Sequence, residues 1–201
     1  MLFTTAPSNP AFNPVLVHEP VVLRAATPAD YPAWSALREE SRAHLTEWEE
    51  AWTPEQADAA AFKRRLRIYD RDRRRGGGLF LLAFRLHDNA LVGGVTLSNI
   101  RYGASRSGLV GYWVGAAYAR QGYGTAAVSA LAAHAFEAIE LNRLVAACQP
   151  GNIASQKLLD RCGFRREGLA RDYLMINGQW RDHYIYALTA ADYRRIKGMP
   201  S

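Results

Sequence analysis

The sequence has only two cysteines, Cys148 and Cys162, and neither lies in a zinc-ligand spacing or beside a histidine pattern. We therefore expect buried thiols, and neither a disulfide nor a metal site. No apolar run approaches the ~20 residues that span a bilayer, and the first residues lack the basic start and apolar stretch of a signal peptide. These absences predict a cytoplasmic protein.

Acidic residues are fewer than basic ones: 19 Asp and Glu against 25 Lys and Arg give a formal net charge of +6. An excess of positive charge favours anionic partners but does not specify a fold. Much of it lies in KRRLRIYDRDRRR (63–75), a helix-like segment that Asp70 and Asp72 interrupt. Two interpretations stay open, a solvated helix surface or a contact with an acidic or nucleic-acid-rich partner.

The chain contains no internal repeat, and its 201 residues suit one domain after an N-terminal arm at 1–20. Strands are expected at 21–26, 79–86, 90–103, 108–114 and 143–150, followed by a hairpin that turns at Asn177-Gly178. Helices are expected at 27–42, at 53–75, at 122–139, from Asn152 and from Thr189. This order predicts an α/β domain over 21–198, with a mixed, mostly antiparallel sheet of about six to seven strands and helices on both faces.

The stretch YARQGYGTAA (118–127) lies between an expected strand and an expected helix. It is either a tight turn or an anion cradle, in which the backbone N–H groups of 119–124 and the helix dipole face a phosphate. Gly122 and Gly124 would let the backbone approach the anion, and Arg120 adds positive charge. A dinucleotide-binding fold is disfavoured because it places its glycines after the first strand.

Two motifs together resemble the acetyl-CoA motifs of the GNAT N-acetyltransferase superfamily: YARQGYGTAA and NIASQKLLDRCGF (152–164). The likeness extends from Val21 to about Tyr193. RDYLMINGQWRDHYIYAL (171–188) and RAHLTEW (42–48) resemble the RimJ/RimL ribosomal-protein N-terminal acetyltransferases, the RimJ type most closely. This resemblance implies a single-domain GNAT fold and transfer of acetyl from acetyl-CoA to the N-terminal α-amine of a protein, with ribosomal proteins as the expected class.

The resemblance also implies which residues bind acetyl-CoA. They are Val114, Arg120, Gln121, Gly122, Tyr123, Gly124, Thr125, Asn152 and Ser155. The backbone N–H near Val114, on a strand that splays from its neighbour in this fold, would bind the thioester oxygen. Two positions depart from the superfamily pattern: Ala119 replaces an Arg or Gln, and Leu159 replaces the tyrosine that protonates the departing thiolate in many members.

The missing tyrosine acid is compatible with an α-amine acceptor. An α-amine has a pKa of about 7.7–8.0, against about 10.4 for lysine, so a useful fraction is neutral at cellular pH. A thiol leaving group with a pKa of about 8.5 departs largely as thiolate. Ser155 is the candidate hydrogen-bond donor to that thiolate; alternatively, it only caps the helix that begins near Asn152.

The resemblance to GNAT enzymes implies that the acceptor side lies around EWEEAW (47–52). Glu49 is the candidate general base, directly or through a water, whereas Glu47 and Glu50 either attract a protonated N-terminus or are only solvated. Asp182 and His183 on the closing hairpin are alternative proton acceptors.

Aromatic residues are expected beside the acceptor. Trp48 and Trp180 would line its pocket unless they only fill core, and Tyr112 belongs to the strand beside the thioester. Neither cysteine lies where an acyl carrier is expected, which favours direct attack in a ternary complex. The rival functions are acetylation of a small-molecule amine, and a non-catalytic ribosome-associated or RNA-associated factor that uses the basic helix at 63–75.

Overall fold

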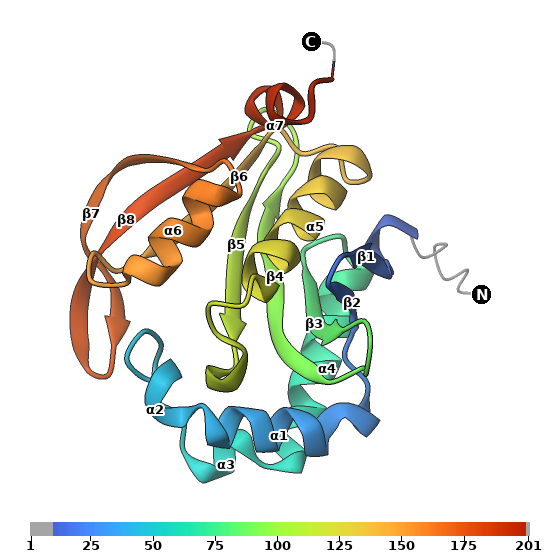
Figure 1. Ribbon diagram of the computed structural model, residues 1–201, viewed down its shortest axis with the longest axis vertical. Helices are drawn as coiled ribbons and strands as arrows, with labels where there is room; N and C mark the ends of the chain where they lie inside the picture. The colour runs from blue at the N-terminus through green and yellow to red at the C-terminus, as the bar shows by residue number, and fades with distance from the viewer. Residues whose placement is uncertain (1–9, 200–201) are drawn as a thin grey trace, which may run out of the picture.

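The computed structural model describes residues 10–199, which form an eight-stranded sheet in the order β1-β2-β3-β4-β5-β6-β8-β7. Neighbouring strands are antiparallel except the parallel pair β5 and β6 (Figure 1). The strands are β1 (Leu16–His18), β2 (Val21–Ala25), β3 (Leu79–Arg85), β4 (Leu91–Arg101), β5 (Ser107–Val114), β6 (Arg143–Cys148), β7 (Arg165–Ile176) and β8 (Gln179–Thr189). The predicted α/β class with a mixed sheet is confirmed.

Helices cover both faces of this sheet, and short 3-10 turns connect several elements. The helices are α1 (Tyr31–Glu40), α2 (Arg42–Leu45), α3 (Pro54–Ala57), α4 (Ala59–Arg74), α5 (Tyr123–Glu137), α6 (Ile153–Arg161) and α7 (Ala190–Lys197). The 3-10 turns are η1 (Pro10–Phe12), η2 (Pro28–Asp30) and η3 (Ala116–Tyr118). None of the helices within residues 10–199 combines the length and hydrophobicity that a membrane span needs.

The described part of the chain contains more strands than the six to seven expected. β1 lies inside the expected arm and pairs with β2 over Leu16↔Leu23, Val17↔Val22 and His18↔Val21. A strand of three residues has too little alternation of polar and apolar side chains to be recognised in a sequence. Residues 1–9 of the expected arm lie outside the described residues.

The helix expected over 53–75 is divided at Asp58. This residue has extended backbone angles (φ −72°, ψ 168°), and its carboxylate accepts a hydrogen bond from the Ala61 amide at 2.6 Å. Because an aspartate in this conformation caps a helix start, α3 ends and α4 begins there. Most of the basic segment 63–75 consequently lies on α4.

Two hydrophobic clusters hold the helices against the sheet. One face of the sheet packs on α5, whose side chains are small and apolar almost all round, as expected for a helix buried on most sides. On the other face, β3 packs against α1 and α4 through Trp34, Leu37, Phe62, Leu82 and Phe84. The central strands are therefore buried on both faces, which fixes the positions of the loops at their ends.

The parallel strands β5 and β6 separate toward their carboxyl ends. They pair only over Ser107↔Arg143, Gly108↔Leu144 and Leu109↔Val145, although β5 continues to Val114. Over the same length β5 stays paired with β4 as far as Gly93↔Val114. The side of β5 that faces β6 is therefore open beyond Leu109, and the loops before α5 and α6 lie at this opening (Figure 1).

Candidate active site

The loop before α5 presents free backbone N–H groups. Gly122 caps the helix with φ +89°, and its carbonyl accepts the Ala126 amide at 3.0 Å, the first turn of the helix. The N–H groups of residues 122–125 consequently have no partner within the helix, and an anion at this end is favoured by them and by the helix dipole. Arg120 is exposed and has no ion-pair partner in the described part of the chain.

The two glycines of this loop have different roles. A Cβ at Gly122 would meet no atom within 4 Å, so glycine is needed there for its positive φ. A Cβ at Gly124 would lie 2.7 Å from Cδ1 of Leu158 and 3.0 Å from Cγ2 of Val114. Gly124 therefore allows α5 to pack closely on α6 and β5, whereas the sequence suggested an approach to the ligand.

The other loop side chains contact protein atoms. The Gln121 amide donates to the Ala117 carbonyl at 2.8 Å, and the Tyr123 ring is buried with its edge toward Tyr118, 6.0 Å between ring centroids. Thr125 is half-buried, and its carbonyl faces the Cys162 thiol at 3.6 Å. What the loop offers a ligand is thus mainly its backbone.

The N–H group of Val114 points into the opening between β5 and β6. The Gly115 amide donates to the Val92 carbonyl at 2.9 Å, so Gly115 faces β4. Because successive amides of a strand point to opposite sides, the Val114 amide faces away from β4. A donor in this position can bind an oxyanion that forms between the two strands.

Ser155 lies at the same opening, on the first turn of α6. The Asn152 side chain caps this helix by accepting the Ser155 amide at 2.9 Å. The Ser155 hydroxyl is 2.6 Å from the phenol oxygen of Tyr112, on β5. The helix is thus capped by Asn152 and not by Ser155, whose hydroxyl faces β5 instead; the role of Ser155 as donor to the thiolate stays a prediction.

The pair of Ser155 and Tyr112 lies beside the buried Cys148 thiol, whereas Cys162 is half-buried. Burial raises the pKa of the Cys148 thiol, although a hydrogen bond with Ser155 opposes this shift, and burial raises the pKa of Cys162 as well. Burial also raises the pKa of Tyr112 well above its ordinary value. Leu159, at the place of the absent tyrosine acid, is completely buried in the core. Among residues 10–199, no group of three or more His, Cys, Asp or Glu side chains could hold a metal ion.

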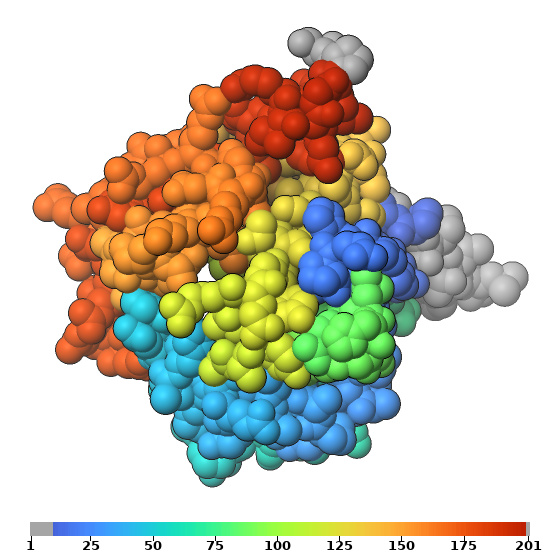
Figure 2. Space-filling view, in the orientation of Figure 1, coloured from blue at the N-terminus to red at the C-terminus, as the bar shows by residue number. Residues whose placement is uncertain are grey.

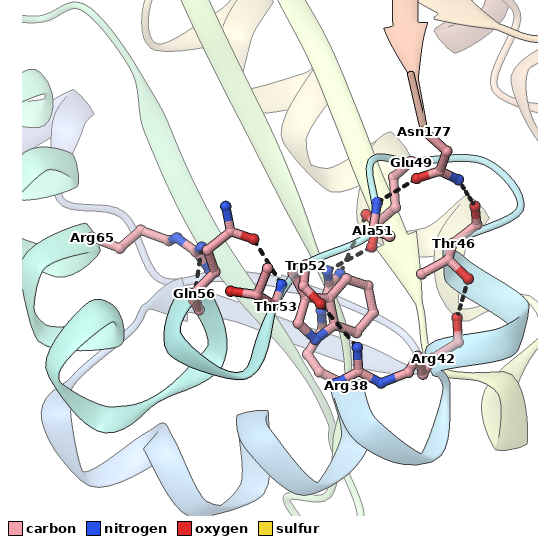
Figure 3. Close-up of polar contacts among 10 residues, drawn as sticks. All are labelled: Arg38, Arg42, Thr46, Glu49, Ala51, Trp52, Thr53, Gln56, Arg65 and Asn177. Atoms are coloured by element: carbon pink, nitrogen blue, oxygen red, sulfur yellow. Dashed lines mark hydrogen bonds and ion pairs between the residues drawn. The ribbon is translucent and has the colours of Figure 1, made fainter. Parts of the chain in front are cut away.

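The acceptor side contains an ion pair that the sequence did not indicate. Arg38 on α1 donates to Glu49 at 2.5 Å, and its guanidinium lies 4.0 Å from the centre of the Trp52 ring (Figure 3). The same guanidinium lies 5.1 Å from the centre of the Trp113 ring. A guanidinium can stack on aromatic faces while it binds a carboxylate. The contacts of Arg38 therefore hold the Glu49 carboxylate in place.

The loop of residues 46–51 is bridged to the tip of the β7–β8 hairpin. The Asn177 side chain donates to the Thr46 carbonyl at 2.8 Å and accepts the Ala51 amide at 2.7 Å (Figure 3). Trp48 in this loop lies 3.7 Å from where a Cβ of Gly151 would be, directly before the Asn152 cap. These contacts close a ring around an opening, visible in Figure 2 between cyan, orange and yellow atoms.

The hairpin residues singled out from the sequence lie outside any shared cluster. Trp180 is 57% exposed, and Asp182 accepts the Asp172 amide at 2.9 Å, which stabilises an irregularity in β7. His183 is 3% exposed and lies on the opposite face of β8 from Asp182. The structure thus brings Tyr112, Ser155 and Asn152 together. The three hairpin residues do not join this group.

The comparisons with known proteins agree with this architecture. The family model of the acetyltransferase (GNAT) domain matches residues 21–165. The chain belongs to the GNAT acetyltransferase family. The ribosomal protein uS5-alanine N-acetyltransferase of Escherichia coli (strain K12) is 30% identical over 178 residues, which cover 89% of this chain and 87% of the relative.

Two further similarities support the GNAT assignment. Mycobacterium smegmatis RimJ, solved in complex with CoA-disulfide, superposes with a TM-score of 0.80 at 32% identity, covering 89% of this chain and 88% of RimJ. The probable N-acetyltransferase YjcK of Bacillus subtilis (strain 168) is 36% identical over 109 residues, which cover 54% of this chain and 60% of YjcK. This chain is accordingly an N-acetyltransferase with a GNAT fold.

Sequence reasoning missed two residues of this candidate site. Arg38 sits within a helix and carries no local signal, and Asn177 was recognised only as a turn residue. Their partners are distant in sequence, so only the fold reveals the contacts. Glu47 and Glu50 are exposed and form no ion pair within residues 10–199.

Proposed function

We propose that this chain transfers acetyl from acetyl-CoA to the N-terminal α-amine of a protein, with cytoplasmic ribosomal proteins as the substrate class. The observation that carries this proposal is the ring closed by Asn177 beside the helix that bears Ser155. An enclosed opening admits the end of a chain more easily than a side chain in the middle of one. The similarity to the Escherichia coli uS5-alanine N-acetyltransferase supports the same acceptor.

Acetyl-CoA is the acetyl donor, and the backbone groups at the opening suit it. The free N–H groups of residues 122–125, with Arg120, fit a pyrophosphate. The Val114 amide fits the thioester oxygen, because it faces the gap between β5 and β6. Asn152 and Ser155 lie at the other wall of that gap. The similarity to RimJ, solved with CoA-disulfide, supports this assignment.

The reaction is direct attack by the neutral amine on the thioester carbon. A nitrogen–carbon bond forms, the Val114 N–H stabilises the oxyanion, and the carbon–sulfur bond then breaks with its electron pair on sulfur. The Ser155 hydroxyl stabilises the departing thiolate. Because Glu49 is paired with Arg38, we assign Glu49 to binding the ammonium form of the acceptor. Water then accepts the proton that the amine loses.

A mass-spectrometric competition tests this function. Acetyl-CoA is supplied with a lysine-free peptide that has a free Ala or Ser N-terminus and with an N-terminally blocked peptide that contains one lysine. We expect acetylation of the α-amine alone. Preference for the lysine would contradict the proposal, and faster turnover of a polyamine or an aminoglycoside would establish the small-molecule alternative.

A second partner is suggested by the exposed face of α4. Lys63, Arg64 and Arg67 are exposed and have no ion-pair partner in the described part of the chain, whereas Arg73 and Arg74 both bind Asp70, at 2.6 and 2.8 Å. Residues three and four apart share one face of a helix. We propose that this face contacts ribosomal RNA phosphates while the opening holds the protein terminus.

Charge reversal tests the RNA contact separately from catalysis. The double variant Arg64→Glu and Arg67→Glu should weaken binding to a ribosomal RNA fragment and lower the salt dependence of binding, with peptide acetylation unchanged. Arg194→Glu and Arg195→Glu on α7 are the matched control. Equal RNA affinity in wild type and in the α4 variant would rule out this role.

A further inference from the structure

The contact between Tyr112 and Ser155 joins the two walls of the opening. Tyr112 lies on β5 beyond the last pair with β6, and Ser155 lies at the start of α6, yet their side-chain oxygens are 2.6 Å apart. We propose that Tyr112 is a positioning residue whose phenol donates to the Ser155 oxygen and thereby directs the Ser155 proton toward the departing sulfur. The inference rests on the role proposed above for Ser155.

If Ser155 donates to the thiolate, the number of protons on its hydroxyl requires Tyr112 to be the donor of their shared hydrogen bond. Ser155 has one proton to donate and two lone pairs to accept with. If Ser155 donated to Tyr112, it could not also donate to a thiolate. With Tyr112 as the donor, the Ser155 proton is free to point into the opening or, before substrate binds, toward the neighbouring Cys148 thiol.

Tyr112 keeps its own proton throughout. Its phenol is buried, and burial raises its pKa well above the ordinary value, so ionisation is disfavoured. The thiolate leaves with the electron pair of the carbon–sulfur bond and accepts a hydrogen bond from Ser155, while solvent takes the amine proton and later protonates the sulfur. No net proton leaves Ser155 or Tyr112, which distinguishes this arrangement from a tyrosine that acts as the acid.

Both members of the pair are held rigidly. The Tyr112 backbone pairs with Val95 of β4, and the Ser155 amide is fixed by Asn152 at 2.9 Å. Position 159 of α6 is a completely buried leucine, so α6 itself offers no phenol there. The hydroxyl that orients the donor comes instead from the opposite wall.

A double-mutant cycle tests the inference with whichever peptide amine the enzyme acetylates. We expect Tyr112→Phe to lower kcat about tenfold, the effect of one hydrogen bond, with KM for acetyl-CoA unchanged. Ser155→Ala should lower kcat further. In the Ser155→Ala background, Tyr112→Phe should have no additional effect, because the two residues act as one unit.

Tyr193→Phe is the matched control. The Tyr193 phenol lies on α7 and donates to Glu137 at 2.5 Å, so this variant loses an equally short hydrogen bond away from the opening. Thermal melts should show comparable stability in both Phe variants, with kcat lowered only in Tyr112→Phe.

Each contrary result has a separate meaning. Unchanged kcat in Tyr112→Phe, or losses that add in the double variant, would overturn the positioning role and leave Ser155 as the donor. Unchanged kcat in Ser155→Ala would overturn the role of Ser155 itself, and the inference with it. None of these results depends on whether the acetylated amine is an N-terminus or a lysine.

Discussion

The two sides of the opening are built differently. On the acetyl-CoA side, most of the groups that can bind a ligand belong to the backbone: the free N–H groups before α5 and the N–H of Val114, which faces away from β4. On the acceptor side, side chains connect distant segments, as when Asn177 binds Thr46, 131 residues away in sequence. The first side depends on local conformation, the second on tertiary contacts.

This difference predicts two kinds of sensitivity. A backbone site tolerates most side-chain changes but fails when a residue can no longer adopt its φ angle. A site made of side-chain bridges fails when one bridging group is lost. The loss of such a group on the acceptor side should change acceptor binding and leave acetyl-CoA binding unchanged. Variants of the two sides should therefore separate acetyl-CoA affinity from the acceptor KM.

Gly122→Val should cause the largest loss. Gly122 has φ +89°, which a β-branched residue does not tolerate, so the turn that exposes the N–H groups must rearrange. We expect acetyl-CoA affinity to fall about 100-fold, or about 2.7 kcal/mol, which is close to the loss of one charge-assisted hydrogen bond. Isothermal titration calorimetry with acetyl-CoA measures this change.

Gly103→Val controls for strain alone. Gly103 has φ +72°, and a Cβ there would also meet nothing within 4 Å, but it lies in the turn between β4 and β5, away from the loop before α5. This variant should lose similar stability and keep its acetyl-CoA affinity. Equal affinity losses in the two variants would mean that global destabilisation, and not the anion site, explains the effect.

The distinction between local conformation and tertiary contacts also explains what the sequence could predict. The class of the fold, most strands and the turn at Asn177-Gly178 follow from local patterns, and the structure contains them. β1 was missed because three residues show no pattern, and the break at Asp58 was missed because the basic stretch after it suggested one continuous helix. Both errors concern boundaries, where local signals are short.

For the site, local signals revealed the glycine loop and a helix that begins near Asn152, which are properties of neighbouring residues, although the cap is Asn152 and not Ser155. The pairing of Arg38 with Glu49 depends instead on how the segment after α2 folds back on α1, and no spacing in the sequence encodes it. Tyr112 was expected beside the thioester, but its contact with Ser155 required the divergence of β5 and β6 to be known.

Arg38→Ala should have an intermediate effect, confined to the acceptor side. It removes the partner of Glu49 and the cation that contacts the Trp52 and Trp113 rings. Because hydrogen bonds to charged groups contribute about 1.5–3 kcal/mol, we expect the free energy of unfolding to fall by about 2 kcal/mol. The acceptor KM should rise, with acetyl-CoA affinity unchanged; urea denaturation and steady-state kinetics measure the two effects.

An ion pair with an exposed arginine provides the control for Arg38→Ala. Arg195 binds Asp192 at 2.6 Å with 64% of its own side chain exposed, and Asp192 keeps Arg165 as a second partner at 3.3 Å. Loss of Arg195 should therefore cost no more than the about 0–1 kcal/mol of an exposed pair. If Arg38→Ala were no more destabilising than Arg195→Ala, the Arg38–Glu49 pair would not hold the acceptor loop.

Asn177→Gly should have the smallest effect and is the sharpest probe of the ring. Glycine accepts the φ of +50° at this position, so the variant removes the two side-chain bonds without straining the turn. We expect the acceptor KM to rise about fivefold, close to 1 kcal/mol for exposed hydrogen bonds. Acetyl-CoA affinity should stay the same.

Asn177→Asp divides the bridge into its two bonds. A carboxylate can still accept the Ala51 amide but cannot donate to the Thr46 carbonyl, so one side of the ring loosens and the other holds. Its acceptor KM should lie between those of the wild type and Asn177→Gly.

If the ring selects chain ends, the same order should appear in the competition between the two peptides, with the blocked lysine peptide acetylated most by Asn177→Gly. A flat response across the three proteins would mean that the opening is wide enough for a lysine and that selection for the α-amine arises from its lower pKa alone.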